Sequence, residues 1–421
     1  MLFVLQLTAC VAICLALAWL GRRAASIARQ PQVIGEISGG LIAGPALLHA
    51  LGPDFFDKLL PADVLDALTV IGQMGLVLFL AGLIHEYRDT PSIRKIGLVL
   101  WVTGASLVLP LAAGVLMAMW LLAVDDPVLV GSAPRPAFIL FCGVALSITA
   151  VPVLARILSD RELTNSPAGR VALIAAIAID AVSWVLLTIV AGLSAGSALG
   201  LVLVLVKFGA AAVCVVALRR TLGRSSVRAM AVRHPRWFSA AIVGGAIFAG
   251  LIAQRLGLSI IMGAVLFGLT IPAAQGSIWN SVVAPAVRLG RLVVPVFFVA
   301  TGITLFDKAF GVVSWSLIGV CIVVAIIAKI GGGYLGARLA GEDGWTSARV
   351  GVLLNTRGLT ELIVLQAGYG LGVITAAMYF AFVVMALATT ALTGPLLSLI
   401  HWMQARRPAR VSAAASGPGL R

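Results

Sequence analysis

Asp180 is an ionisable residue within a long apolar stretch, and this setting limits the chemistry that it can serve. Apolar and small residues surround it from Val171 to Leu193, and no basic residue interrupts that stretch. An unpaired carboxylate at the centre of a bilayer costs at least about 2.5 to 3.5 kcal/mol, so acids there typically mark pathways for cations or protons. Asp180 is therefore the primary candidate for binding a monovalent cation or a proton.

Four more charged residues within apolar stretches are candidates for a functional role: Glu36, Lys329, Arg357 and Glu361. Lys329 is too deep in its stretch for easy snorkelling, so we expect it to balance a buried carboxylate. Arg357 and Glu361 are four residues apart, a spacing that favours an intrahelical ion pair. Glu36 has two open interpretations, a second proton-accessible acid or a partner for a basic residue.

Other kinds of functional site find no support in the residue spacing. No cluster has the spacing of a metal site, a nucleophile triad or a phosphate-binding loop. The five cysteines lie in apolar stretches without a CxxC pair. We therefore expect neither an enzyme nor a cofactor, and no metal beyond a transported monovalent ion.

The elements that must position these residues are membrane helices. The chain is 61% hydrophobic and 11% charged, with a mean hydropathy of +1.10, and soluble domains have about 25% charged residues. Its apolar stretches have the length of about 20 residues that a bilayer requires. The sequence predicts an all-α integral membrane protein with thirteen spans, near residues 1–20, 31–51, 65–84, 96–122, 136–158, 168–193, 198–218, 236–254, 257–273, 287–306, 312–337, 348–368 and 372–401.

The basic residues predict the orientation of these spans, because cytoplasmic loops collect Lys and Arg. With the N-terminus outside and the C-terminus in the cytoplasm, 23 of the 30 Lys and Arg residues lie on the cytoplasmic side. This asymmetry predicts a multi-pass protein of the cell membrane. It also explains the net charge of +14 by contact with the lipid bilayer rather than with nucleic acid.

The spans leave no room for a soluble domain. Residues 1–403 are predicted to form one transmembrane domain. Residues 404–421 are polar and rich in small residues, and we expect them to form a short disordered cytoplasmic tail.

Two of the predicted spans are interrupted in the middle by polar or helix-weakening residues. The fifth contains Ser147, Thr149 and Pro152, and the twelfth contains the segment from Asn355 to Glu361. They are seven spans apart, and an odd offset makes the two copies antiparallel. Inverted repeats with a broken helix in each half are typical of secondary transporters that bind ions near the bilayer midplane. The hydroxyl groups of Ser147 and Thr149, and the carbonyl freed by Pro152, are candidate cation ligands.

Five motifs in sequence order resemble the monovalent cation/proton antiporter superfamily, in particular its second branch. They are QVIGEI from Gln32 with Gly44–Pro45, SITAVPVLARIL from Ser147, Asp180 with Trp184, PVFF from Pro295 with Gly302, and NTRGLTEL from Asn355. Together they cover nearly the whole chain.

The resemblance implies an elevator-type exchanger of sodium or potassium for protons, forming a homodimer with a mobile core and two crossed broken helices. Asp180 matches the acid that binds cation and proton in turn. Lys329 matches a basic residue near that acid, and Arg357 with Glu361 matches a charged pair of the second broken helix. Ile179 departs from the family, which usually has a polar residue at this position.

Three functional hypotheses follow. The first is a cation/proton exchanger, electroneutral because Asp180 is the only exchangeable acid on its span. The second, motivated by Ile179, is a sensor or regulatory membrane protein that does not exchange ions. The third is an organic-solute transporter of the same fold.

Overall fold

The structure, a computed structural model, describes residues 2–28, 30–52, 60–88, 96–124, 129–195, 199–256, 260–272, 278–309 and 314–406. Throughout these ranges the chain is helical, apart from connections and one isolated bridge between Val130 and Ile374. The helices are α1 (Leu2–Ile27), α2 (Gln32–Leu51), α4 (Ala62–Arg88), α5 (Ile96–Val124), α6 (Arg135–Ser147), α7 (Val151–Asp160), α8 (Pro167–Ala195), α9 (Leu199–Leu222), α10 (Ser225–Arg233), α11 (Pro235–Arg255), α12 (Ile260–Thr270), α13 (Ile278–Ala309), α14 (Trp315–Leu339), α15 (Gly344–Leu354), α16 (Leu359–Gly370) and α17 (Ala376–Ala405).

The helices follow the predicted spans in order. Nine segments of the described chain are long and apolar enough to cross a membrane, with α6 and α7 taken together as one segment. The other four predicted spans fall on α2, α9, α12 and the pair α15–α16. The predicted all-α membrane fold is confirmed, and the short helix α10 is added between the seventh and eighth spans.

Both predicted interruptions are breaks in the helical backbone. The helix α6 ends at Ser147, and α7 starts at Val151 with Pro152 at its beginning, where a missing N–H costs nothing. The helix α15 ends at Leu354, and α16 starts at Leu359. Gly358 precedes α16 with φ 157° and ψ −139°, a combination that is almost exclusive to glycine.

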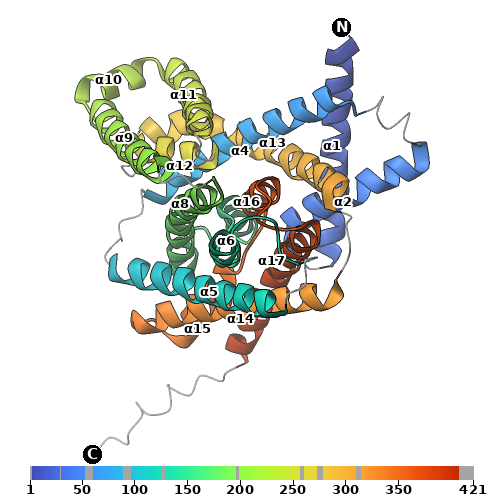
Figure 1. Cartoon of the computed structure of the whole chain (residues 1–421). Helices are drawn as coiled ribbons and strands as arrows, with labels where there is room; N and C mark the ends of the chain where they lie inside the picture. The colour runs from blue at the N-terminus through green and yellow to red at the C-terminus, as the bar shows by residue number, and fades with distance from the viewer. Residues whose placement is uncertain are drawn as a thin grey trace, which may run out of the picture.

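The helices pack in two groups with the broken helices in one of them. The first group contains α1, α2, α4, α10, α11, α12 and α13, and the second contains α5, α6, α7, α8, α14, α15, α16 and α17, while α9 contacts both α8 and α12. In Figure 1 the helices α4 and α13 run between α9–α12 at one edge and α1–α2 at the other, and the second group fills the centre and the lower part of the view. Contacts between the groups include those of α2 and α4 with α7, and of α13 with α17.

The end of α17 bears on the predicted division of the chain. Its helix continues to Ala405, two residues into the segment assigned to the tail. Residues 407–421, which hold most of that predicted tail, lie outside the described residues.

Candidate functional site

The two breaks cross and are joined by hydrogen bonds. The amide N–H of Ala150 donates to the carbonyl of Thr356 over 3.1 Å, and the hydroxyl of Thr149 donates to the carbonyl of Leu354 over 3.2 Å. A side chain at Gly358 would have its Cβ 2.6 Å from a methyl group of Val153. Glycine is therefore needed here for close approach as well as for its backbone angles.

The last four carbonyls of α6 all find a partner within the crossing. The carbonyl of Val144 accepts from the amide of Ile148 and from the hydroxyl of Ser147. The following carbonyls of the helix end, Ala145, Leu146 and Ser147, accept from the buried cations Arg357 and Lys329. A helix end carries partial negative charge, so two cations stabilise it electrostatically.

The end of α15 is completed by neutral donors. The backbone amides of Asn355 and Thr356 donate to the carbonyls of Gly351 and Leu353, respectively. The hydroxyl of Thr149 donates to the carbonyl of Leu354. Asn355 also anchors the break to α17 through its side-chain amide, which donates to the carbonyl of Thr389 over 3.1 Å. The two crossed helix ends therefore differ in charge, because the described donors at α15 include no Lys or Arg.

Lys329 satisfies a second freed carbonyl, on α5. Its ammonium group donates to the carbonyl of Ser106 over 3.1 Å, in addition to that of Ser147. Within a regular helix the carbonyl of Ser106 would accept from residue 110, but Pro110 has no N–H. Lys329 thus bridges α14 to two helices at positions where each lacks a backbone donor.

Arg357 and Glu361 form the predicted ion pair. Their side chains lie 2.7 Å apart, and both are fully buried. Arg357 is further fixed by Thr390 of α17, whose hydroxyl accepts from its amide and donates to its carbonyl. The pair is part of the second break, and Arg357 also reaches the first.

Asp180 lies on the buried face of α8 and is 3% exposed. This helix packs on α5, α6, α7, α9 and α15, which include parts of both broken helices. Within the described part of the chain, Asp180 has neither a hydrogen bond nor an ion pair. A buried carboxyl without a protein partner is free to take up a proton or a cation.

Of the buried carboxylates, Glu361 rather than Asp180 interacts with Lys329. The ammonium group of Lys329 makes no ion pair with Asp180, and the charged groups acting on it are Arg357 and Glu361. The cause is geometric, because the carbonyls at Ser106 and Ser147 hold the ammonium group at the end of α6. Lys329 therefore acts on the broken helix rather than directly on the acid.

The remaining predicted residues all lie at the crossing. The hydroxyls of Ser147 and Thr149 each donate to a backbone carbonyl, and a hydroxyl that donates still has lone pairs for a cation. Pro152 starts α7, and Asn355 ends α15. Sequence reasoning missed Pro110 and Thr390, although a proline inside the fourth span was a visible signal.

Glu36 is fully buried at the contact between the two helix groups. Its carboxylate lies 3.5 Å from the guanidinium of Arg22 on α1 and 3.6 Å from that of Arg156 on α7. Arg156 also lies 3.2 Å from Asp160. Of the two interpretations left open, the structure favours a partner for basic residues.

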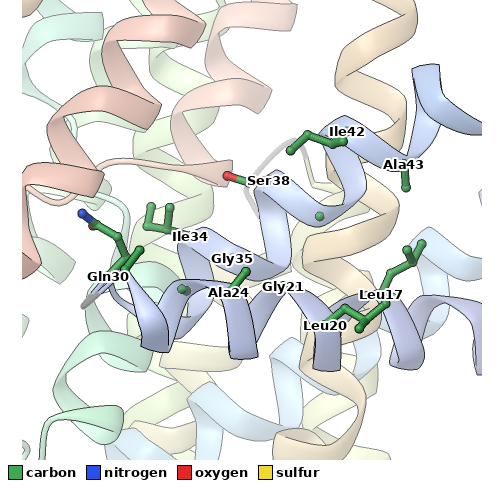
Figure 2. Close-up of a pocket in the computed structure, with 13 residues that line it drawn as sticks. Leu17, Leu20, Gly21, Ala24, Gln30, Ile34, Gly35, Ser38, Ile42 and Ala43 are labelled. Carbon is green, nitrogen blue, oxygen red and sulfur yellow. The ribbon is translucent and has the colours of Figure 1, made fainter.

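A groove of about 530 Å³ lies between α1 and α2, and its lining includes neither Asp180 nor the residues of the two breaks. It is lined mainly by small and apolar side chains, with Gln30 and Ser38 as polar members (Figure 2). The two helices touch at Gly21 and Gly35, where an added Cβ would lie about 2 Å from a carbonyl oxygen. No carboxylate lines the groove, so it does not suit a cation.

Comparisons with known proteins show the family of the chain. The family described as "Sodium/hydrogen exchanger, transmembrane" matches residues 11–402. The chain is 30% identical to the Na(+)/H(+) antiporter NhaS4 of Synechocystis, covering 89% of this chain and 92% of the relative. It is 33% identical to Cation/H(+) antiporter 18 of Arabidopsis thaliana, over 91% of this chain and 46% of the relative. It is 28% identical to K(+)/H(+) antiporter 1 of Saccharomyces cerevisiae, over 89% of this chain and 44% of the relative.

The chain thus spans nearly all of the cyanobacterial relative and about half of the plant and yeast proteins. Among solved structures, the sodium proton antiporter MjNhaP1 from Methanocaldococcus jannaschii matches with a TM-score of 0.67 at 17% identity. That match covers 95% of this chain and 97% of the other, and it shows the shared fold. By the extent of the family match and its identity to a relative of nearly equal length, the chain belongs to the sodium/hydrogen exchanger family of membrane transporters, which are not enzymes.

Proposed function

We propose that this protein exchanges sodium or potassium ions for protons across a membrane by alternating access, with Asp180 binding the cation and the proton in turn. The observation that carries this proposal is the state of Asp180. It is buried on α8 against the broken helices and has no protein partner among the described residues. Competition of the two ions for one carboxyl couples their fluxes.

The crossed breaks supply the remaining parts of the site. Ser147 and Thr149 offer oxygen atoms beside the helix ends, where a dehydrated cation needs ligands. Hydrogen bonds fix the positions of those ends: Lys329 and Arg357 bind carbonyls at the end of α6, and Asn355 binds α17. Pro152 keeps the first break from closing into a continuous helix, because it has no N–H to donate.

The contacts of the cations support electroneutral exchange. Lys329 is engaged with two carbonyls, and Arg357 is paired with Glu361. Asp180 is then the one exchangeable acid on α8. One carboxyl trades one proton for one monovalent cation, so a cycle moves no net charge.

The setting in the cell is part of the proposal. The distribution of Lys and Arg supports an outside N-terminus and a cytoplasmic C-terminus in the cell membrane. The family resemblance supports a homodimer in which the group with the broken helices moves against the other. The relatives named as antiporters favour exchange over a sensor or an organic-solute transporter.

The proposal is tested with the full chain in liposomes that contain a pH-sensitive dye. Addition of sodium or potassium should move protons in the wild type, and Asp180→Asn should abolish the signal, because Asn holds neither a proton nor a full negative charge. Asp180→Glu keeps a carboxyl and serves as the matched control for insertion and side-chain burial. Full activity of a correctly folded Asp180→Asn protein would exclude Asp180 as the exchange site.

A further inference from the structure

Ser183 shares the buried face of α8 with Asp180. It is three residues further along the helix, and the two side chains are 2% and 3% exposed. Residues at this spacing are neighbours on a helix surface. The same buried face continues through Ala172, Ala176, Leu187 and Val190.

The hydroxyl group of Ser183 has no hydrogen-bond partner in the structure. Other hydroxyl residues of α8 donate to the carbonyl four residues back: Thr188 to Trp184 over 2.9 Å, and Ser194 to Val190 over 3.0 Å. Ser183 could do the same with Ile179 but does not. A buried polar atom without a partner is uncommon and calls for an explanation.

Few other oxygen atoms are available along this stretch. Between Val171 and Leu187, the only side-chain oxygens of α8 belong to Asp180 and Ser183. The residue before the acid, Ile179, is apolar and fully buried. A cation that leaves water must replace its hydration shell with several oxygens, and one carboxylate is too few.

We propose that the Ser183 hydroxyl oxygen is a ligand of the cation that binds at Asp180. The inference rests on the proposed function and adds a ligand on the same helix. The lone pairs of the hydroxyl face the ion while its proton turns away, as in any neutral oxygen ligand. Because the hydroxyl is not used by the resting fold, ion binding breaks no existing bond.

The test compares Ser183→Ala with Ser194→Ala, a matched removal of a hydroxyl from the same helix. Exchange is measured in liposomes as a function of sodium and potassium concentration. Ser183→Ala should raise the KM for the cation about five- to tenfold, the range expected for losing one neutral polar contact, with little change in the maximal rate. Ser183→Thr keeps the hydroxyl and should restore a KM near the wild type, and Ser194→Ala should leave it unchanged.

Thermal melts in detergent separate ligation from a structural role. Since the Ser183 hydroxyl has no protein partner, Ser183→Ala should melt no lower than the wild type without the cation. Added sodium or potassium should raise the melting temperature of the wild type more than that of Ser183→Ala, because a ligand stabilises the state that binds it.

The outcomes distinguish this inference from the proposed function. An active wild type whose KM and cation-induced stabilisation are unchanged by Ser183→Ala would overturn the inference and leave exchange at Asp180 intact. A wild type that is stabilised by the cation more than Ser183→Ala is, but that moves no protons, would overturn the proposed exchange function and support Ser183 as a cation ligand. A wild type that shows neither response would overturn both.

Discussion

Lys329 holds two backbone carbonyls that their own helices leave without a donor, and this makes a sharp prediction possible. The carbonyl of Ser106 lacks a donor because Pro110 has no N–H, and that of Ser147 lies at the end of α6. The perturbation is Lys329→Met, which keeps most of the side-chain volume and removes the ammonium group.

The magnitude follows from the two carbonyls. A buried acceptor left without a partner costs about 1 to 3 kcal/mol, so two cost about 2 to 6 kcal/mol. The loss is offset in part, because methionine avoids the cost of burying a charge. That offset is the same in any background that leaves the surroundings of Lys329 unchanged.

A double-mutant cycle with Pro110→Ala cancels this offset, because the avoided cost of burying the Lys329 charge is the same in both backgrounds. Alanine at position 110 supplies the missing N–H to the carbonyl of Ser106, so Lys329→Met then strands one acceptor instead of two. We expect Lys329→Met to be less destabilising in the Pro110→Ala background by about 1 to 3 kcal/mol.

The assay is equilibrium unfolding of the four proteins by SDS in mixed micelles, followed by tryptophan fluorescence. A coupling energy near zero, with Lys329→Met equally harmful in both backgrounds, would refute the assignment of Lys329 to the Ser106 carbonyl.

Three further predictions concern other parts of the structure. Glu36→Gln removes one of the two acidic partners of Arg156, the one that joins α2 to α7. The free energy of unfolding in SDS should fall by less than the about 3 to 5 kcal/mol of a fully broken buried pair, because Asp160 still pairs with Arg156; an unchanged free energy of unfolding would contradict it. Asp343→Ala removes the N-cap of α15 and should lower the free energy of unfolding by about 0.5 to 2 kcal/mol at pH 7. Hydrogen bonding to Thr346 lowers the pKa of Asp343, so its stabilisation is present above the ordinary aspartate pKa of about 3.9 and is lost as the pH falls through the lowered pKa. The stabilities of wild type and variant should therefore converge in acid, and an equal difference at pH 7 and in acid would be inconsistent with a charged cap. In liposomes with an imposed membrane potential, the rate of exchange should not depend on the voltage, because a one-to-one cycle moves no net charge. A cycle that moved one charge would gain or lose about 2.3 kcal/mol per 100 mV, so a rate that follows the voltage would exclude one-to-one exchange.

Much of the architecture could be predicted from the sequence because a bilayer imposes strong rules on it. A helix or a broken helix of the structure lies at each of the thirteen predicted positions, and nine of these segments are long and apolar enough to cross a membrane. Mid-span polar residues with Pro152 marked the breaks. Arg357 and Glu361 were predictable as a pair because both lie on one turn of one helix. Such features depend on local sequence alone.

The features that escaped prediction depend on how distant helices meet. The resemblance placed Lys329 near Asp180, but its hydrogen bonds go to carbonyls of α5 and α6, which packing against α14 brings within reach. Ser183 gave no signal either, because side-chain rotation decides whether its hydroxyl donates to the carbonyl of Ile179 or has no partner, as in the structure.

The central claim is that one carboxyl, Asp180, releases a proton when it binds a cation. The most direct test adds sodium or potassium to the purified protein in weakly buffered detergent solution and counts the protons released per chain. We predict up to one proton per chain for the wild type and none for Asp180→Asn. Proton release of the same size from a folded Asp180→Asn protein would contradict the account.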